Sequence, residues 1–438
     1  MIGAGFLYTH DSADAAVVIV NTCAFIEAAV QESIDTILDY RAENERALIV
    51  VAGCLPLRYR ESLKEALAEA DLFITPDQIQ QLPQILATVH RKSGRPALAE
   101  HQMAAKRSRH SCTSVAEAGG EKRAPAGSAA AEGPARVLTT PGYAYLRISE
   151  GCSRRCKYCT IPSIRGPLRS ADPNRLEEEA RCLSSWGARE LILVAQDLTA
   201  YGLDLEGKKA LTRLVKRLSR VPAVQWIRLM YLHPDSLPRG LTQLMRESDR
   251  LLPYLDVPIQ HVSPKVLKAM GRPWKGDRIR RLFDRLRDEV SGLVLRTTLM
   301  VGYPEEGERE FRELRDFLAS YEIEHVGVFT YSPEEGTPAY ELGDPVPAAV
   351  KHERAEELRK IHSKHTRARN RQRIGAVESC MVQGLSDETD LLLAGRTWDQ
   401  APEIDGMLYI TAGSASVGEI RNVLITAAHG PDLFGELV

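Results

Sequence analysis

Three of the eight cysteines of this chain lie close together, at Cys152, Cys156 and Cys159. They form the pattern C-x3-C-x2-C in the segment GCSRRCKYCT. In a reducing compartment, clustered cysteines more often bind metal or do redox chemistry than form disulfides. A structural zinc ion usually takes four nitrogen or sulfur ligands, but the next histidine after the triplet is His233. Three thiolates suit a 4Fe-4S cluster with one iron open to another ligand, so the spacing favours an iron–sulfur site over zinc.

The composition limits what such a site can serve. A chain of 438 residues has room for two or three domains with cores of their own. Its 57 Lys and Arg nearly balance 59 Asp and Glu, so any attraction to nucleic acid must come from a local patch. No early apolar segment resembles a secretory signal, and no apolar run is long enough for a membrane span. We therefore expect a cytoplasmic protein that does not enter a membrane.

A regular alternation of strands and helices is expected to position the triplet. The strand YAYLRIS (143–149) precedes the cysteines, and the helical pattern PNRLEEEARCLSSW (173–186) follows them. Further apolar strands are predicted at 191–196, 224–231, 254–260, 295–302 and 326–332. Six β/α units predict an open relative of the β/α barrel, whose active sites lie on loops at the carboxyl ends of the strands. The cysteine triplet lies at such an end.

The triplet and its setting resemble those of the radical S-adenosylmethionine (SAM) enzymes, because an aromatic residue, Tyr158, precedes the third cysteine. The resemblance implies that Cys152, Cys156 and Cys159 hold a 4Fe-4S cluster whose open iron binds SAM. Reduction of that cluster would cleave SAM to a 5'-deoxyadenosyl radical. Tyr158 would lie beside the adenine, with plain core packing as the alternative.

The amino-terminal region repeats one design around two other cysteines. A buried strand at 17–20 leads to Cys23 and an amphipathic helix, and a strand at 48–51 leads to Cys54. In a parallel sheet both thiols would emerge at the carboxyl edge, where such sheets bind ligands, although two unrelated buried cysteines remain the alternative. The segments VNTCAF and AGCLPLRY resemble the amino-terminal domain of the methylthiotransferases. These radical SAM enzymes carry a second 4Fe-4S cluster on three cysteines of that domain.

One ligand of the second cluster has no counterpart in this sequence. The family's first cysteine lies in a Gly-Cys-Pro-Lys-Asn-like turn, which the opening MIGAGFLYTHDSADAAVVIV lacks. We expect that the sequence starts too far downstream or is truncated. Cys112 is a weak substitute, because its Ala-, Gly- and Ser-rich surroundings are typical of a disordered linker. Cys182 and Cys380 are interpreted as structural.

The carboxy-terminal region changes the sign of its charge. The helical stretch 351–373 has nine Lys and Arg against three Glu, and we interpret it as a solvated helix face with ribosomal RNA contact as the alternative. From Gly375 to Val438, two Arg face ten acids in short strands that predict a small β-barrel of the TRAM type. Such an acidic barrel would repel RNA phosphates and complement a basic ribosomal protein.

Further motifs extend the resemblance over nearly the whole chain. They include VAQDLTAYG, YLDVPIQHVSPKVLKAMGRP, LMVGYPEEGEREF and FTYSPEEGTPA. The set resembles the methylthiotransferases that modify an aspartate of ribosomal protein S12 more than those that act on tRNA adenosine. We predict an α/β domain lacking its start at 1–96, a disordered linker at 97–136, a radical SAM barrel at 137–372 and a TRAM-like barrel at 373–438.

The resemblance implies a reaction that uses two SAM molecules. One donates a methyl group to a sulfur at the second cluster, and the other is cleaved at the first. The radical removes hydrogen from the aspartate Cβ, which then takes the methylthio group. A flavodoxin or ferredoxin is implied as electron donor. The alternatives are a tRNA adenosine methylthiotransferase and a partly inactive iron–sulfur protein that still cleaves SAM.

Polar residues at the ends of barrel strands are candidates for binding SAM and the substrate. They are Gln196, Asp197, Arg228, Gln260 and His261. Each of these side chains could instead satisfy buried backbone groups. The protein needs only to bind and aim the reactants, because the cofactors carry the hard chemistry.

Overall fold

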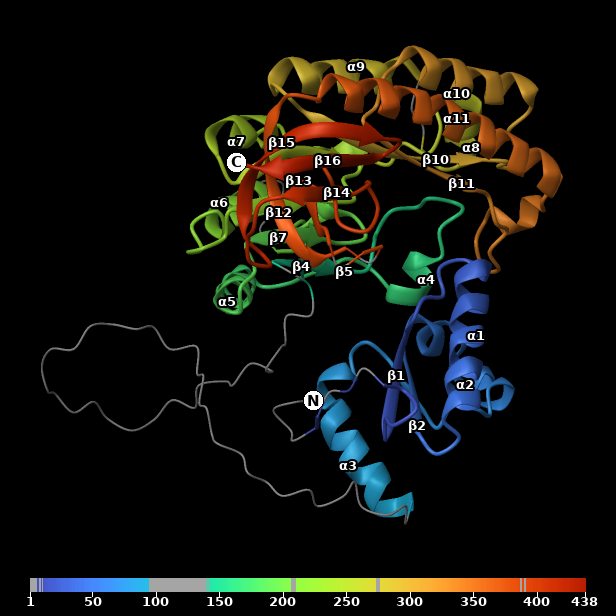
Figure 1. Ribbon diagram of the computed structural model, residues 1–438. Helices are drawn as coiled ribbons and strands as arrows, with labels where there is room; N and C mark the ends of the chain where they lie inside the picture. Colours follow the sequence, from blue (N-terminus) through green and yellow to red (C-terminus); the bar gives the residue numbers. More distant parts are fainter. Residues whose placement is uncertain are drawn as a thin grey trace, which may run out of the picture. The chain divides into compact units, whose positions relative to one another are not determined.

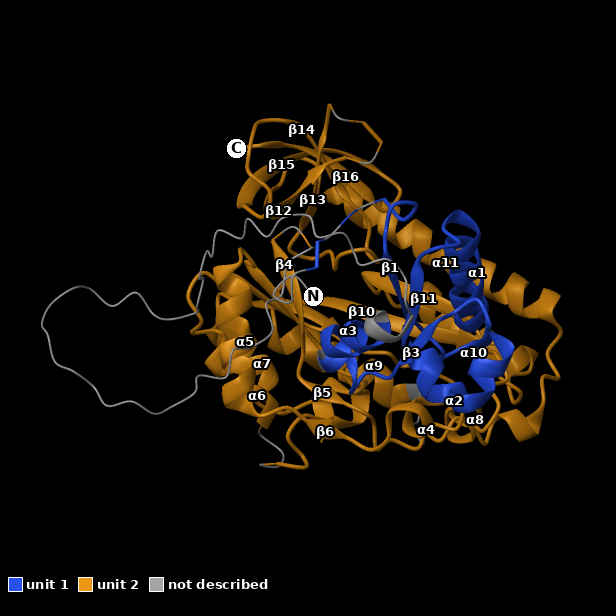
Figure 2. Cartoon of the chain, turned by 90° about the horizontal axis from the view of Figure 1, so that it is seen from below, with its two compact units in different colours: residues 1–137 blue, residues 138–438 orange. Residues whose placement is uncertain are grey.

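The computed structural model describes residues 6–7, 9, 11–93, 140, 142–205, 210–272, 276–386, 388–389 and 391–438 (Figure 1). The chain divides into two compact units, residues 1–137 and 138–438 (Figure 2). The linker predicted at 97–136, with Cys112, lies outside the described residues. Over the described ranges, no helix is both long and apolar enough to cross a membrane.

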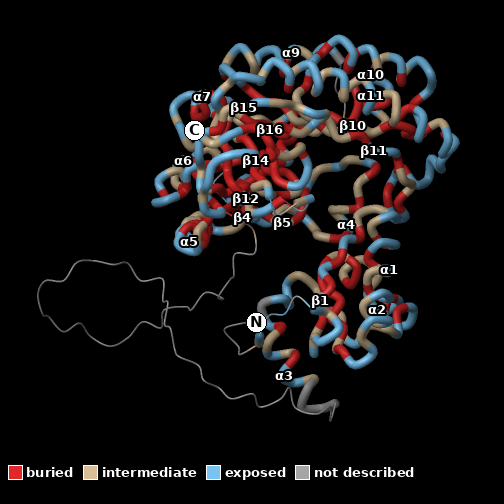
Figure 3. The backbone as a smooth tube through the Cα atoms, in the orientation of Figure 1, coloured by how far each residue is buried: buried red, intermediate tan, exposed pale blue. Residues whose placement is uncertain are grey.

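The first unit is a three-stranded parallel sheet in the order β1-β2-β3 with helices packed against it. Its elements are β1 (Val17–Thr22), α1 (Glu27–Glu43), β2 (Leu48–Gly53), α2 (Cys54–Ala66), β3 (Leu72–Ile74), η2 (Ile79–Gln81) and α3 (Leu82–Ser93). Along β2, Ile49 and Val51 belong to the core shared with α1 and α2, whereas Val50 and Ala52 pack with α3. Helices on both faces explain why this strand is apolar throughout and buried (Figure 3).

The second unit contains six parallel strands in chain order, β4-β7-β8-β9-β10-β11, with β4 and β11 as the edges of an open sheet. The strands are β4 (Tyr143–Arg147), β7 (Glu190–Val194), β8 (Trp226–Leu229), β9 (Leu251–Asp256), β10 (Val294–Val301) and β11 (His325–Thr330). The main helices are α5 (Pro173–Ser185), α6 (Ala210–Leu218), α7 (Leu241–Glu247), α9 (Gly276–Glu289), α10 (Glu308–Ser320) and α11 (Ala348–Gln372). The predicted open six-unit β/α barrel is therefore confirmed.

Short elements join the strands to these helices. They are β5 (Ser149–Glu150), α4 (Ile161–Arg165), β6 (Arg169–Ser170), η3 (Leu198–Ala200), η4 (Pro234–Ser236), α8 (Pro264–Ala269) and η5 (Tyr340–Leu342). The strand predicted at 254–260 was placed too late, because β9 already ends at Asp256. Pro258 has no backbone N–H to donate, so the chain leaves the ladder there and returns only at the single bridge from Gln260 to Leu299.

The two faces of the six-stranded sheet have different partners. Alternate residues such as Ile227 and Leu229 of β8 pack into the large apolar core that includes the surrounding helices. The residues between them face the inside of the open barrel, where Trp226 and Tyr254 belong to a separate cluster. Because side chains alternate across a strand, Arg228 shares that inner face with Trp226.

The carboxy-terminal barrel covers the amino-terminal part of this inner face. It is a closed barrel in the order β12-β13-β14-β16-β15. Its strands are β12 (Val377–Leu385), β13 (Leu393–Thr397), β14 (Leu408–Ala412), β15 (Ile420–His429) and β16 (Asp432–Leu437). Met381 and Ala401 of this barrel pack in the same cluster as Tyr143, Trp226 and Tyr254 of the sheet.

Buried charges join the two barrels of the second unit. Glu190 on β7 accepts hydrogen bonds from Arg228 (2.8 Å) and from Arg396 of the carboxy-terminal barrel. Burial alone would raise the pKa of Glu190, but Arg396 and Arg228 outweigh it and lower that pKa. Asp405 accepts from the Tyr254 hydroxyl and lies 3.3 Å from Arg296 Nε. Buried ion pairs and hydrogen bonds of this kind hold the carboxy-terminal barrel against the six-stranded sheet.

Helix α11 differs from the solvated face that its sequence suggested. Lys351 is buried and donates to the Tyr331 carbonyl (2.9 Å), and Arg354 pairs with Glu306 (2.8 Å). Arg369 and Arg373 both pair with the buried Asp399. A basic helix therefore uses several of its cations inside the second unit, while others, such as Lys360, Lys364 and Arg367, are exposed.

Candidate functional site

The cysteine triplet lies on the loop that follows β4 and β5, at the carboxyl end of the first barrel strand. The backbone N–H of Cys152 donates to the Gly166 carbonyl (3.0 Å), and that of Cys159 donates to the Cys156 carbonyl (3.2 Å). Gly151 has a φ of +75°, and a Cβ there would lie 2.1 Å from the Pro167 carbonyl oxygen. The tight approach of the chain before the first cysteine therefore requires glycine.

The three sulfurs share a poorly solvated region. Cys152 is 9% exposed, and Cys156 and Cys159 pack at the edge of an aromatic cluster. Burial raises the pKa of Cys152, and it raises the pKa of Cys159 to about 12. Neighbouring cysteines of the triplet add to both shifts, which indicates that the sulfurs converge.

The triplet does not form a compact site for one ion. Among the described residues, no three His, Cys, Asp or Glu side chains are arranged to hold a single metal ion. Thiolates around a four-iron cluster stand farther apart than the ligands of one ion, because each binds a different iron. The chemistry of the donor set, three cysteine thiols on one loop, fits a four-iron cluster with one iron open to another ligand.

Tyr158 is buried between the second and third cysteines. Its ring packs with Met270, Tyr303 and Tyr331. The backbone on its amino-terminal side is tied down as well, since the Lys157 N–H donates to the Met270 carbonyl (3.0 Å). This packing fixes the course of the loop, and the predicted place of Tyr158 beside an adenine stays a prediction.

The end of β7 holds the cysteine loop through Asp197. This buried carboxylate accepts from Arg154 Nε (2.7 Å), and Arg154 also donates to Ser236 Oγ (2.6 Å). The neighbouring Gln196 has a buried Oε1 without a hydrogen-bond partner among the described residues. Gln196 is thus the strand-end side chain with an unused acceptor, whereas Asp197 orients the loop.

Arg228 lies deeper than its prediction as a SAM contact suggests. Its guanidinium donates to Glu190 (2.8 Å) and to the Trp398 carbonyl (2.8 Å), and it lies 4.5 Å from the Tyr254 ring centroid. The side chain is fully buried. These contacts give Arg228 a role in joining the two barrels, and its predicted cofactor role stays untested.

The segment after β9 places Gln260 and His261 next to the end of β10. Gln260 has a φ of +69°, and its carbonyl accepts from the Met300 N–H (2.7 Å). His261 accepts at Nδ1 from the Ser263 N–H (2.9 Å). Its Nε2 lies 3.4 Å from Glu306 Oε2, but neither atom has a hydrogen-bond partner among the described residues.

In the first unit, Cys23 and Cys54 lie at one edge of the sheet, as predicted. β1 and β2 are parallel, and Thr22 is paired with Gly53, the residues directly before the two cysteines. Gly53 has a φ of +106°, and a Cβ there would lie 2.4 Å from the Thr22 carbonyl oxygen, so only glycine allows this approach. Cys23 is exposed and Cys54 is partly buried.

Family models match all three parts of the chain. They are the radical SAM superfamily over residues 146–318, the TRAM domain over 374–438 and the uncharacterized protein family UPF0004 over 1–75. The ribosomal protein uS12 methylthiotransferase RimO of Geobacter sulfurreducens is 42% identical over 98% of this chain and 92% of its own length. The enzyme of the same name from Geotalea uraniireducens is 40% identical over 98% and 92%. The chain belongs to the ribosomal protein uS12 methylthiotransferase family.

The family predicted from the motifs is thus confirmed, and the chain is a radical SAM methylthiotransferase. A solved radical SAM methyltransferase, TsrM from Kitasatospora setae, is 16% identical and covers 84% of this chain and 68% of its own, with a TM-score of 0.49. The radical SAM superfamily implies one 4Fe-4S cluster and SAM. The cysteine loop of this methylthiotransferase fits that cluster, because three converging thiols lie where aromatic residues limit access of water.

Two arginines of this methylthiotransferase contact the cysteine loop but were not predicted from the sequence as site residues. Arg154 lies within the motif, and Arg272 follows α8 in MGRP. Arg272 Nε lies 3.5 Å from Cys156 Sγ, and its Nη1 donates to the Pro258 carbonyl (2.7 Å). Their proximity to the cysteines depends on folding, and 116 residues separate Arg272 from Cys156.

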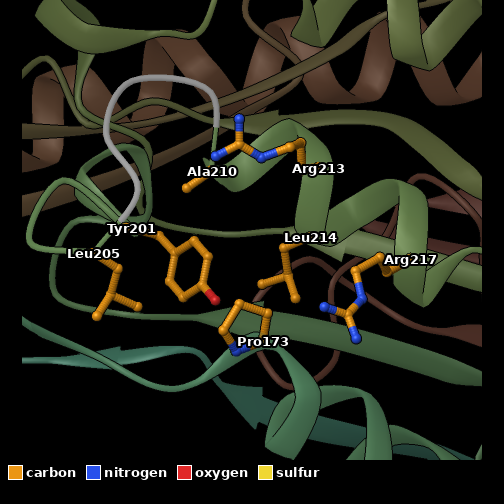
Figure 4. Close-up of a pocket in the computed structure, with 8 residues that line it drawn as sticks. Pro173, Tyr201, Leu205, Ala210, Arg213, Leu214 and Arg217 are labelled. Carbon is orange, nitrogen blue, oxygen red and sulfur yellow. The ribbon is translucent and has the colours of Figure 1, made fainter.

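A cavity of about 170 Å³ lies elsewhere in the barrel of the methylthiotransferase. Figure 4 shows Tyr201, Leu214 and Pro173 around it, with Arg213 and Arg217 at its sides. None of the predicted site residues lines it. Arg217 is bound to Glu177 and Asn174, so the cavity offers little unused polar chemistry.

Proposed function

We propose that this methylthiotransferase replaces a hydrogen on the β-carbon of an aspartate of ribosomal protein uS12 with a methylthio group. The proposal is carried by the similarity over 98% of the chain to enzymes named for that substrate. The cysteine loop at the carboxyl end of the first barrel strand supports it, since the active sites of such barrels lie there. The same relatives favour the protein substrate over tRNA adenosine.

We assign the first cluster to Cys152, Cys156 and Cys159. When bound, this cluster supplies the electron that cleaves SAM. The chain contributes the buried environment of the sulfurs and a loop held by Asp197 through Arg154. Exclusion of water protects reactive species from side reactions.

The SAM molecule is proposed to lie against the strand ends beside this loop. Gln196 offers an unpaired buried acceptor, and Gln260 presents a strained turn that a ligand contact would help to offset. Tyr158 supports the adenine side by its place between two cysteines. Arg228 has less support, because Nε and Nη2 already bind Glu190 and the Trp398 carbonyl and only the buried Nη1 is left without a partner among the described residues.

The second cluster is proposed at Cys23 and Cys54. Their place at one carboxyl edge supports this assignment, because ligands of parallel α/β sheets bind there. The sequence before the linker contains no other cysteine, so a third ligand is not assigned. If no cluster forms at this second site, the protein would cleave SAM without transferring a methylthio group.

The deciding experiment is anaerobic. Reconstituted full chain is incubated with SAM, reductant and uS12, followed by quantification of 5'-deoxyadenosine and the mass of uS12. We expect 5'-deoxyadenosine from this chain, and a modified aspartate once a third ligand completes the second cluster. A modified tRNA adenosine with unmodified uS12 would replace the proposed substrate, and cleavage without transfer would indicate the partly inactive protein.

The substrate is proposed to dock on acids of the carboxy-terminal barrel. Several of its carboxylates are used internally, since Asp399 and Asp405 pair with cations of the second unit. Glu388, Glu403 and Glu436 are exposed, although Glu388 accepts from the Tyr409 hydroxyl (3.3 Å) and Glu403 from the Tyr143 hydroxyl (3.1 Å). Replacing these three by Gln should slow association with basic uS12 several-fold at low salt and less at high salt. Unchanged association at low salt would exclude this surface.

RNA contact is a secondary part of the proposal. The family model of the TRAM domain covers the acidic barrel, and α11 carries exposed cations at Lys360, Lys364 and Arg367. Ribosomal RNA near uS12 could bind there with a salt-dependent affinity. A flavodoxin or ferredoxin is proposed as the electron donor, and the cytoplasm as the place of action.

A further inference from the structure

Arg272 is the cation nearest to the proposed cluster that no part of the mechanism has used. Its Nε lies 3.5 Å from Cys156 Sγ, within hydrogen-bonding reach of sulfur. The guanidinium carbon lies 6.0 Å from the centroid of the Tyr158 ring. Arg272 therefore touches both a proposed iron ligand and the aromatic residue beside the third cysteine.

The backbone holds Arg272 against the cysteine loop. Its N–H donates to the Leu267 carbonyl (2.7 Å), and Nη1 donates to the Pro258 carbonyl (2.7 Å). The preceding Gly271 has a φ of +75°, and a Cβ there would lie 2.7 Å from the Arg155 carbonyl oxygen. Only glycine allows this approach, so the chain just before Arg272 is held close to the cysteine loop.

Arg272 has no carboxylate at ion-pair distance among the described residues, and the acid that lines the same small cavity, Asp235, interacts with it only at longer range. By contrast, Arg154 of the cysteine loop pairs with Asp197. Burial and the two neighbouring arginines, Arg272 and Arg154, lower the pKa of His233 to about 2, so this nearby imidazole stays neutral. A partly buried cation without an acid partner stabilises an anion placed beside it. The sulfur of Cys156 occupies that place.

We propose that Arg272 raises the reduction potential of the cluster by donating a hydrogen bond to Cys156 Sγ and placing a positive charge beside it. The inference rests on the proposed assignment of Cys156 as a ligand. Reduction adds one electron from a low-potential donor, breaks no bond and makes the cluster more negative by one charge. Hydrogen bonds to cluster sulfurs, net charge and solvent exposure set such potentials. Arg272 thus favours the reduced state that SAM cleavage requires.

The test is a redox titration of reconstituted full chain without SAM, read from the electron paramagnetic resonance signal of the reduced cluster. Arg272→Met removes the charge and the donor. At a fixed potential we expect the ratio of reduced to oxidised cluster to fall about tenfold, which is about 59 mV for one electron. Arg272→Lys keeps the charge, so in that variant the ratio of reduced to oxidised cluster should fall less.

Arg155→Met is the matched control. Arg155 lies next to Cys156 in the chain and carries the same charge, but it is exposed, so solvent screens it. We expect less than a threefold change in the reduced fraction for this variant. An equal change in the Arg155 and Arg272 variants, or none in Arg272→Met, would overturn the proposal.

Iron content separates this inference from the proposed function. If Arg272→Met does not load iron, Arg272→Gln is compared with Arg272→Lys, and the inference requires the Gln variant to be harder to reduce. If neither variant loads iron, Arg272 serves assembly and the inference is wrong. Failure of the wild-type chain to load iron at the triplet would instead refute the cluster assignment.

Discussion

The two groups of cysteines are built differently although both lie at the carboxyl ends of parallel strands. Around Cys152, Cys156 and Cys159, a second layer of residues packs on the sulfurs or donates to them. Around Cys23 and Cys54, the structure supplies the sheet edge and the close approach at Gly53, and Cys23 is exposed.

The difference concerns what each site can complete by itself. Three thiols with packed surroundings are prepared for a cofactor that stays in place. Two thiols, of which Cys23 is exposed, provide fewer ligands and less packing than the triplet. The spacing of the cysteines and the burial of their sulfurs therefore both indicate that the triplet is the more complete of the two sites.

Replacing one cysteine of each group with Ala should give the largest difference in 5'-deoxyadenosine formation. Cys156→Ala should lose 5'-deoxyadenosine formation entirely, because one iron loses its protein ligand. Cys54→Ala should keep SAM cleavage, because the triplet stays intact. Both are measured in anaerobic assays with equal protein. Equal 5'-deoxyadenosine from Cys156→Ala and wild type would show that the triplet is not the site.

In the iron-free protein at pH 8, the exposed Cys23 should be alkylated about a hundredfold faster than Cys159. Burial raises the pKa of Cys159 to about 12, so at pH 8 only about one part in 10⁴ is thiolate. The greater nucleophilicity of a basic thiolate offsets part of that deficit. The alkylation rate of Cys159 should rise about tenfold per pH unit between 8 and 10, and mass spectrometry reports each site. Labelling of Cys159 as fast as the exposed Cys23 at pH 8 would contradict the buried arrangement.

Replacing Gly271, which lies against the cysteine loop, should have a smaller effect, on the free energy of unfolding. Gly271→Ala meets the Arg155 carbonyl and a left-handed φ, whereas Gly292→Ala meets a similar φ of +69° in open space. We expect Gly271→Ala to lose about 1–3 kcal/mol more of the free energy of unfolding than Gly292→Ala. Urea unfolding measures both. Equal losses would show that the loop does not depend on this contact.

Iron content should differ by about a factor of two from that of an enzyme with two complete clusters. Three thiolates at one site and two at the other predict about four iron per chain after reconstitution. Cys54→Ala should leave that number unchanged, and Cys156→Ala should lower it. About eight iron per wild-type chain would show that two cysteines are enough at the first unit.

Much of this architecture could be predicted because its signals are local. The period of apolar residues identified the six barrel strands, and Cys23 and Cys54 followed strands that the structure pairs in parallel. The end of β9 was misplaced because the apolar run continues through Pro258. Periodicity records which residues are apolar, but it does not record which residues can donate to a ladder.

The contacts that tune the site were not predictable in the same way. Arg272 reaches Cys156 across 116 residues, and Arg396 reaches Glu190 across 206. The charges of α11 suggested a solvated face, yet Lys351 and Arg354 have partners inside the second unit. A charge in a sequence carries no sign of its partner until the fold brings the two together.

The buried ion pair between Glu190 and Arg396 has a consequence for how this family can exchange domains. Glu190 belongs to the six-stranded sheet and Arg396 to the carboxy-terminal barrel, and both are buried. A barrel acquired from another protein by recombination would bring an unmatched residue to position 396. Removing one partner of a buried pair is costly, whereas replacing both with well-packed apolar residues can be neutral. Lineages should therefore keep or lose these two residues together, so that the carboxy-terminal barrel is inherited with its sheet rather than as a free module.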